Sequence, residues 1–227
     1  MGWFVSYVRS SVGAKHVMAV TGLGLLLFAI FHMIGHLGMF AGRDAYNTYA
    51  HTLQSLGSLK WLARGGLLAI FAIHVASGIR LAAANRSARP VRYAVTRRAR
   101  TSVFARTMAM TGLIILGFVV YHLCHFTLGW VQPETFHQLD DQGRYDAYGM
   151  FVAGFRGQPL LLISYLIPVT LLSFHLAHGA SSWFQSLGLR HPRYDRGIDR
   201  LGPILAGLLV LGYAAPPVAI ALHLITP

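Results

Sequence analysis

The sequence predicts an all-α integral membrane protein, a bundle of five transmembrane helices. The chain of 227 residues is 55% hydrophobic and only 11% charged, whereas soluble domains carry about 25% charged residues. Its apolar residues gather in five segments, each long enough at ~20 residues to cross about 30 Å of hydrocarbon. These segments lie near 15–40, 61–84, 105–130, 158–187 and 202–225. Residues 1–227 therefore form a single predicted membrane domain.

Charged residues are distributed unevenly between the two sides of the predicted bundle. One side holds 14 of the 19 basic residues: Arg9, Lys15, Arg80, Arg86, Arg89, Arg92, Arg97, Arg98, Arg100, Arg106, Arg190, Arg193, Arg196 and Arg200. The other side holds five of the seven acidic residues: Asp44, Glu134, Asp140, Asp141 and Asp146. The positive-inside rule then predicts a cytoplasmic N-terminus and an outside C-terminus. No cleavable signal pattern precedes the first segment, so we expect a multi-pass protein of the inner (cytoplasmic) membrane.

The net charge of +12 does not indicate nucleic-acid binding, because it follows the membrane topology. We interpret the basic clusters mainly as topology signals. A second interpretation is that they dock a cytoplasmic partner or anionic membrane lipid.

Four histidines lie inside the apolar segments in two repeated contexts. His32 ends TGLGLLLFAIFH in the first segment, and His122 ends TGLIILGFVVYH in the third. His74 in HVASGIR and His175 in HLAHGAS are each followed by glycine four residues later. An ionisable side chain in the membrane interior is expensive, so these residues indicate a functional site.

The rise of 1.5 Å per residue along a helix sorts the four histidines by depth. His32 and His122 each lie 17 residues along helices that run outward, and His175 lies 17 residues along a helix that runs inward. His74, on the second helix, lies near the middle of the membrane or slightly toward its cytoplasmic side. We therefore pair His32 with His122 (the outer pair) and His74 with His175 (the inner pair).

Two imidazoles from separate membrane helices are the ligands that hold haem iron from both faces. The only cysteine, Cys124, lies in no CxxCH motif for covalent attachment. The sequence therefore predicts two b-type haems, with His32, His74, His122 and His175 as axial ligands. We expect Arg80 and Lys15 to bind the haem propionates, because cationic side chains suit carboxylates; Arg80 could instead extend to the lipid surface.

Neighbouring residues leave alternatives open. His36 lies one turn above His32, and His178 close to one turn below His175, so each is a rival ligand; His125 is a weaker rival to His122. Thr21-Gly22 and Thr111-Gly112 lie three turns, about 16 Å, below the outer histidines, at the level of the inner pair. Their small residues, like Gly78 and Gly179, could clear space for a porphyrin or simply let helices pack closely.

No Asp or Glu lies within the predicted spans, which disfavours a proton pump or proton-coupled transporter. The chain also carries no phosphate loop, zinc motif or nucleophile–base constellation. We expect it to be a subunit without substrate chemistry of its own beyond a haem or a quinone pocket.

Several stretches together resemble the dihaem cytochrome b membrane-anchor subunit of succinate:quinone oxidoreductase, the succinate dehydrogenase and fumarate reductase group of complex II. They are SSVGAKHVMAVTG, FHMIGH, IHVASGIR, MTGLIILGFVVYHL, YDAYGMFVAGF and FHLAHGASSWFQSLG, which extend over nearly the whole chain.

The resemblance implies partners and a reaction. A flavoprotein subunit would oxidise succinate or reduce fumarate, and an iron–sulfur subunit would relay electrons to this anchor. A quinone, commonly menaquinone in this branch, would react at a membrane pocket. Polar candidates for that pocket are Ser11, Lys15, His16 and Arg80 on one side and His36 and Tyr46 on the other. Some members carry intramembrane glutamates for proton movement, which this chain lacks. The alternatives are a haem b anchor of another respiratory dehydrogenase and a haem-free polytopic transporter.

Overall fold

The computed structural model describes residues 2–88 and 103–226, and within them the ordered elements are helices. Five helical segments are long and apolar enough to cross a membrane. They are α2 (Ser11–Leu37) continued by the 3-10 helix η1 (Gly38–Ala41), α4 (Ser58–Ser87), α5 (Val103–His122) continued by the π-helical turn η2 (Leu123–Thr127), α7 (Pro159–Ser186) and α8 (Asp195–Ala221). The predicted all-α fold with five such helices is confirmed.

The boundaries of the spans differ from the predicted ones where a helix continues into polar sequence. α8 begins at Asp195 rather than near residue 202, and it ends at Ala221 rather than near 225. Hydropathy marks where an apolar stretch begins, whereas the helix already starts in its polar flank. Two acidic residues therefore lie in the first turns of α8, where Asp195 and Asp199 both form ion pairs with Arg190.

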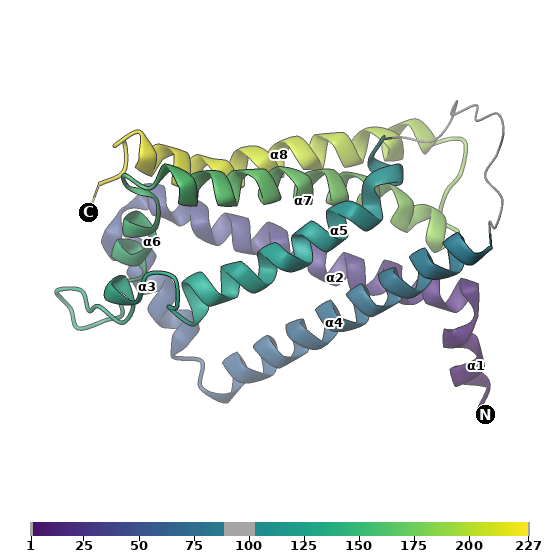
Figure 1. Cartoon of the computed structure of the whole chain (residues 1–227), viewed down its shortest axis with the longest axis horizontal. Helices are drawn as coiled ribbons and strands as arrows, with labels where there is room; N and C mark the ends of the chain where they lie inside the picture. Colours follow the sequence, from purple (N-terminus) through teal and green to yellow (C-terminus); the bar gives the residue numbers. More distant parts are fainter. Residues whose placement is uncertain (1, 89–102, 227) are drawn as a thin grey trace.

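Four helices form a ring that positions the histidines. α2 packs against α4, α5 packs against α7, and the ring closes through α2 with α7 and α4 with α5. α8 packs outside the ring, against α7 and α2 (Figure 1). α8 packs closely on α7 at Gly202, where an added Cβ would lie 2.1 Å from the carbonyl oxygen of Ala177.

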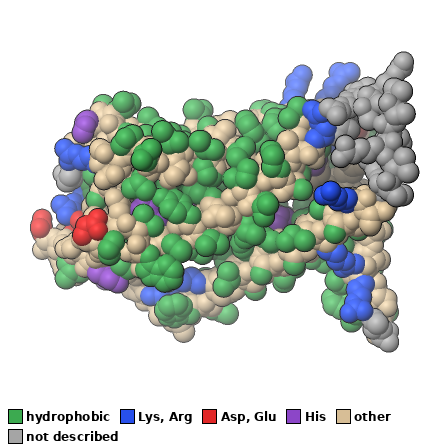
Figure 2. All heavy atoms as spheres, viewed as in Figure 1, with side chains coloured by type: hydrophobic (Ala, Val, Ile, Leu, Met, Phe, Trp, Pro, Cys, Tyr) green, Lys and Arg blue, Asp and Glu red, His purple; other side chains and the backbone are tan. Residues whose placement is uncertain are grey.

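Large apolar side chains cover the sides of the bundle. Leu113 of α5, Leu160 of α7 and Leu211 of α8 each expose at least 69% of their surface, and the visible face is largely hydrophobic between its two ends (Figure 2). Helices suit this surface because every backbone polar group in hydrocarbon must be satisfied within the chain. The chain is a multi-pass membrane protein.

Short helices that the sequence did not predict cover the two ends. α1 (Trp3–Arg9) turns away from α2 at the N-terminal end, while α3 (Arg43–Gln54), the 3-10 helix η3 (Pro133–Thr135) and α6 (Ala147–Phe155) lie at the opposite end, near the C-terminus (Figure 1). The prediction of a basic cluster between the second and third spans falls partly on 89–102, outside the described residues.

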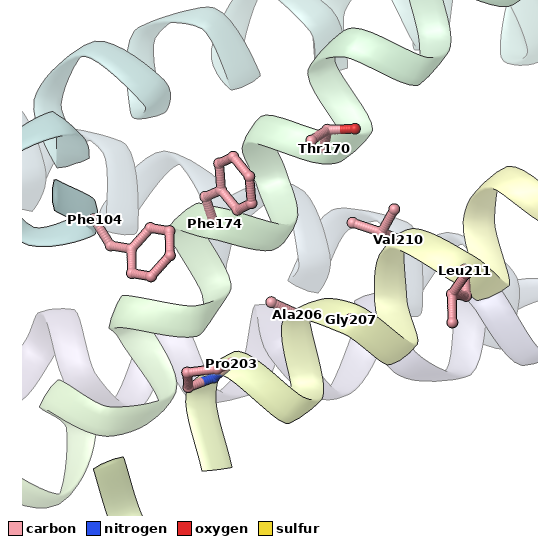
Figure 3. A pocket seen from close by; sticks show the side chains of 8 residues that line it. All are labelled: Phe104, Thr170, Phe174, Pro203, Ala206, Gly207, Val210 and Leu211. Carbon is pink, nitrogen blue, oxygen red and sulfur yellow. The ribbon is translucent and has the colours of Figure 1, made fainter. Parts of the chain in front are cut away.

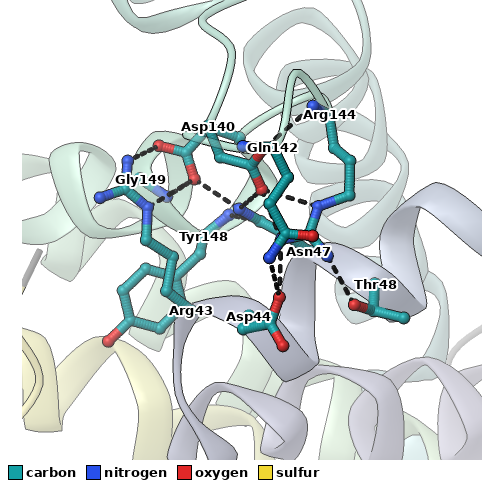
Figure 4. A network of polar contacts seen from close by, with 10 residues as sticks. Arg43, Asp44, Asn47, Thr48, Asp140, Gln142, Arg144, Tyr148 and Gly149 are labelled. Carbon is teal, nitrogen blue, oxygen red and sulfur yellow. Dashed lines mark hydrogen bonds and ion pairs between the residues drawn. The ribbon is translucent and has the colours of Figure 1, made fainter.

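α3 and α6 are joined by a buried polar network, which we call the outer cap because it lies at the predicted outer end (Figure 4). At its centre Asn47, 0% exposed, donates to the Asp140 and Asp146 carboxylates at 3.1 and 2.9 Å and accepts from the Tyr148 amide. Ion pairs complete it: Arg43 with Asp146 at 2.6 Å, and Arg144 with Asp140 at 2.7 Å and Asp44 at 2.8 Å.

The outer cap shifts the pKa values of its carboxyl groups. Hydrogen bonds from Arg144 hold the pKa of Asp140 well below its usual range. Burial opposes ionisation of Asp146, but the hydrogen bonds from Arg43, Asn47 and the Gly149 amide outweigh it, so its pKa is also lowered. Both groups are therefore ionised at neutral pH.

Candidate functional site

The ring of helices brings the four histidines together in two pairs. The imidazole centres of His32 on α2 and His122 on α5 are 5.9 Å apart, with the ring planes at 82°. Those of His74 on α4 and His175 on α7 are 6.4 Å apart, with the planes at 71°. These are the two pairs that helix depth predicts.

Both separations fit imidazoles that bind one metal ion from opposite sides. With metal–nitrogen bonds of about 2 Å, two such rings have their centres roughly 6 Å apart. A haem iron requires two such ligands from opposite sides, because the porphyrin leaves two axial positions, one on each face. The geometry of both pairs therefore fits the predicted axial ligands.

At the inner pair each histidine is oriented by a threonine from the neighbouring helix. Thr21 Oγ1 of α2 lies 3.1 Å from His74 Nδ1, and Thr111 Oγ1 of α5 lies 3.2 Å from His175 Nδ1. Each hydroxyl proton goes to a carbonyl in its own helix, that of Val17 at 2.7 Å and that of Thr107 at 3.0 Å. The hydroxyl oxygens must then accept, so the two imidazoles donate from Nδ1.

This arrangement selects the tautomer that a metal requires. With the proton on Nδ1, the Nε2 lone pair of His74 and of His175 is free to bind a metal ion. The adjoining glycines set the distance between the helices: an added Cβ would lie 3.2 Å from His74 Cε1 at Gly22 and 3.5 Å from His175 Cε1 at Gly112. Both Thr-Gly pairs thus lie at the inner pair, as their spacing predicts.

The rival histidines have different surroundings. His178 lies on the same helix as His175, but Thr111 contacts His175, which identifies it as the imidazole facing α5. His125 is 3% exposed and uses both ring nitrogens, Nδ1 with the Tyr165 hydroxyl at 2.9 Å and Nε2 with Gln132 at 3.0 Å. No nitrogen of His125 is left for a metal.

His36 lies beside the outer pair. Its Nε2 is 3.3 Å from His32 Nε2, and its Nδ1 is 3.0 Å from the buried Tyr46 hydroxyl. Its ring also stacks on Phe151 with centres 4.9 Å apart. Two imidazoles of α2 therefore lie at the outer site, and the ring-centre distance of 5.9 Å pairs His122 with His32.

The predicted propionate ligands lie at the N-terminal end of the bundle, where the structure gives Arg80 another role. Its guanidinium donates to the carbonyl oxygens of Val8 at 3.3 Å and of Arg9, the last residue of α1. Arg80 thereby fixes α1 against α4. Lys15 lies in the second turn of α2 and is exposed. The nearby quinone candidate His16 contacts the Tyr7 hydroxyl.

An apolar groove on the side of the bundle is separate from the histidines (Figure 3). It runs between α7 and α8, where its lining includes Phe174 and Leu211, and Phe104 of α5 reaches its edge. Among the described residues that line it, the only polar side chain is that of Thr170, which donates to the Leu166 carbonyl at 2.8 Å. These lining residues include no group suited to redox or acid–base chemistry.

Comparisons of the chain with protein-family models, curated proteins and solved structures gave no match. The assignment of a function therefore rests on the histidine geometry and the sequence motifs.

Sequence reasoning missed two features of the structure. It did not predict that the threonine hydroxyls contact the imidazoles; the shared eleven-residue spacing to His32 and His122 indicated the depth of the threonines but not their partner. It also missed Trp183 of α7, whose buried indole Nε1 has no hydrogen-bond partner among the described residues. A signal for Trp183 exists, because it follows His175 and Gly179 at intervals of four residues.

Proposed function

We propose that this chain is the dihaem b membrane-anchor subunit of a succinate:quinone oxidoreductase. It passes electrons between an iron–sulfur subunit and a membrane quinone, with menaquinone as the expected quinone. The observation that carries the proposal is the two pairs of imidazoles, each from two different membrane helices, at ring-centre distances of 5.9 and 6.4 Å.

The chain's own residues would bind and orient the two cofactors. His74 and His175 would bind the inner iron through Nε2, with Thr21 and Thr111 holding their Nδ1 protons. His32 and His122 would bind the outer iron. When bound, two b haems supply one-electron carriers at two depths, a function that suits electron transfer across a membrane.

The identity of the partner complex rests on the sequence resemblance. The stretches IHVASGIR and FHLAHGASSWFQSLG contain the inner ligands, and FHMIGH and MTGLIILGFVVYHL contain the outer ones. The same imidazole pairs also suit a haem b anchor of another respiratory dehydrogenase, such as a hydrogenase or formate dehydrogenase. A flavoprotein subunit that copurifies with an iron–sulfur subunit would select the succinate and fumarate enzyme.

One purification tests the proposal. The assembly is isolated from membranes, and its dithionite-reduced minus oxidised spectrum and pyridine haemochrome are measured. We expect b-type bands and about two haems per chain, together with succinate-driven reduction of a menaquinone analogue. A colourless assembly would contradict the proposal and leave the haem-free transporter. Two haems without succinate activity would instead favour the anchor of another dehydrogenase.

A further inference from the structure

Trp183, near the end of α7, carries an unused hydrogen-bond donor. Its indole Nε1 is buried, yet it has no partner among the described residues. The indole ring contacts Phe184 edge-on, with centres 4.8 Å apart. A buried N–H without an acceptor costs about 1–3 kcal/mol, so this donor points to an acceptor supplied by a bound group.

The position of Trp183 relates it to the inner pair. His175, Gly179 and Trp183 follow one another at four-residue intervals, which places them along one face of α7. Eight residues correspond to about 12 Å along the helix, and helical side chains lean toward the N-terminal turn, which brings the indole back toward Gly179. An added Cβ at Gly179 would meet nothing within 4 Å.

We propose that the Nε1–H of Trp183 donates a hydrogen bond to a propionate carboxylate of the inner haem; this inference rests on the proposed function. A haem held by His74 and His175 would lie against α7, and Gly179 leaves open space on this face of the helix. A carboxylate in hydrocarbon requires nearby donors. The predicted donor Arg80 is engaged with the α1 carbonyls, whereas the Trp183 donor is uncommitted.

A hydrogen bond to a propionate has a measurable electronic effect. It draws negative charge away from the iron and so favours the ferrous state. Replacing Trp183 with Phe removes the donor and keeps an aromatic ring, so the midpoint potential of the inner haem should fall. A threefold change in the reduction equilibrium corresponds to about 28 mV for one electron. The outer haem should keep its potential.

The experiment is an optical redox titration of the isolated assembly carrying Trp183→Phe. The inner haem is identified as the one lost in His74→Ala. Trp61→Phe is the matched control, because this tryptophan of α4 is 65% exposed. Trp183→Gln, which retains an N–H donor, should recover part of the shift. An unchanged inner potential in Trp183→Phe, or an equal shift in Trp61→Phe, overturns the proposal.

A second measurement does not depend on the stability of the Trp183 variants. Ultraviolet resonance Raman spectra report the hydrogen bonding of indole N–H groups, and the unmodified assembly is compared with His74→Ala. Loss of the inner haem should move one tryptophan signal toward the unbonded position. Identical spectra contradict the inference. An assembly without any haem would contradict the proposed function itself, so the two failures are distinguishable.

Discussion

Thr21 on α2 holds the ring of His74 on α4 through a hydroxyl that lies 3.1 Å from Nδ1. Thr111 on α5 repeats this relationship with His175 on α7 at 3.2 Å. The helix pair α2–α4 is thus matched by α5–α7, and in each pair the first helix also carries an outer histidine.

The first prediction concerns the axial ligands. His74→Ala or His175→Ala should each remove the same inner haem, because one remaining imidazole cannot hold the iron from both faces. His32→Ala or His122→Ala should remove the outer haem. Pyridine haemochrome analysis should fall from about two haems per chain to about one.

His178→Ala and His125→Ala are the matched controls and should retain both haems. Loss of a haem in His178→Ala with both retained in His175→Ala would reverse the assignment on α7. Loss of a haem in His36→Ala, with both haems retained in His32→Ala, would identify His36 rather than His32 as the outer ligand.

The second prediction concerns the threonines. Thr21→Val or Thr111→Val removes the acceptor for an imidazole Nδ1 proton, and loss of such an outer-shell partner typically weakens metal binding about 10–100-fold. We expect partial loss of the inner haem during dilution in detergent, measured by the Soret absorbance. Thr107→Val is the control, because its hydroxyl bonds the Val103 carbonyl in its own helix at 3.0 Å. Equal haem retention in all three variants would contradict the role of Thr21 and Thr111 in holding the inner histidines.

The third prediction concerns packing of α8. An added Cβ at Gly202 would lie 2.1 Å from the Ala177 backbone oxygen, whereas one at Gly207 would meet nothing within 4 Å. Gly202→Ala should therefore force α7 and α8 apart and lower the thermal unfolding temperature. Gly207→Ala should leave it unchanged or raise it slightly, since alanine favours helix by about 0.5–1 kcal/mol. Equal effects of the two substitutions would refute this contact.

The fourth prediction concerns Asn47 in the outer cap. Asn47→Leu leaves the buried Tyr148 amide without its acceptor and deprives two carboxylates of a donor. Each unsatisfied buried group costs about 1–3 kcal/mol, so the free energy of unfolding should fall by several kcal/mol. Thr52→Ala on the exposed part of α3 should change it by less than about 0.5 kcal/mol.

The fifth prediction concerns pH. The carboxyl pKa values of Asp140 and Asp146 are lowered in the folded cap, relative to about 3.9 in the unfolded chain. Their contribution to stability is therefore fully present above pH 4 and is lost as the pH falls through the folded values. Hydrogen exchange, corrected for intrinsic rates, should show loss of protection in α3 and α6 below about pH 4. Unchanged protection of α3 and α6 at pH 2 would contradict the predicted pH dependence of the outer cap.

The sequence was a good guide to everything governed by local periodicity. Apolar runs predicted the five spans, and the rise per residue predicted that His32 lies with His122 and His74 with His175. The sequence was a poor guide to the boundaries of the spans. α8, for example, extends into the polar residues around Asp195, where ion pairs with Arg190 support the helix.

Contacts between distant residues that share no periodic pattern were beyond sequence reasoning. Asn47 meets Asp140 and Asp146 only because α3 folds against the loop before α6, and neither residue type nor spacing signals this. Likewise, Arg80 has the charge of a carboxylate ligand, but its contact with α1 depends on the turn between α1 and α2, whose geometry no local pattern specifies.

The eleven residues from Thr21 to His32, and from Thr111 to His122, lie within uninterrupted helices. One continuous helix on each side therefore reaches the levels of both histidine pairs. The axial distance of about 16 Å between each threonine and the outer histidine of the same helix is set by the helix itself, whereas the inner histidines lie on α4 and α7 and depend on the packing of those helices against α2 and α5. Under the proposed function, the distance between the two haems, and with it the rate of electron tunnelling, would follow the packing of α4 and α7 against these two helices.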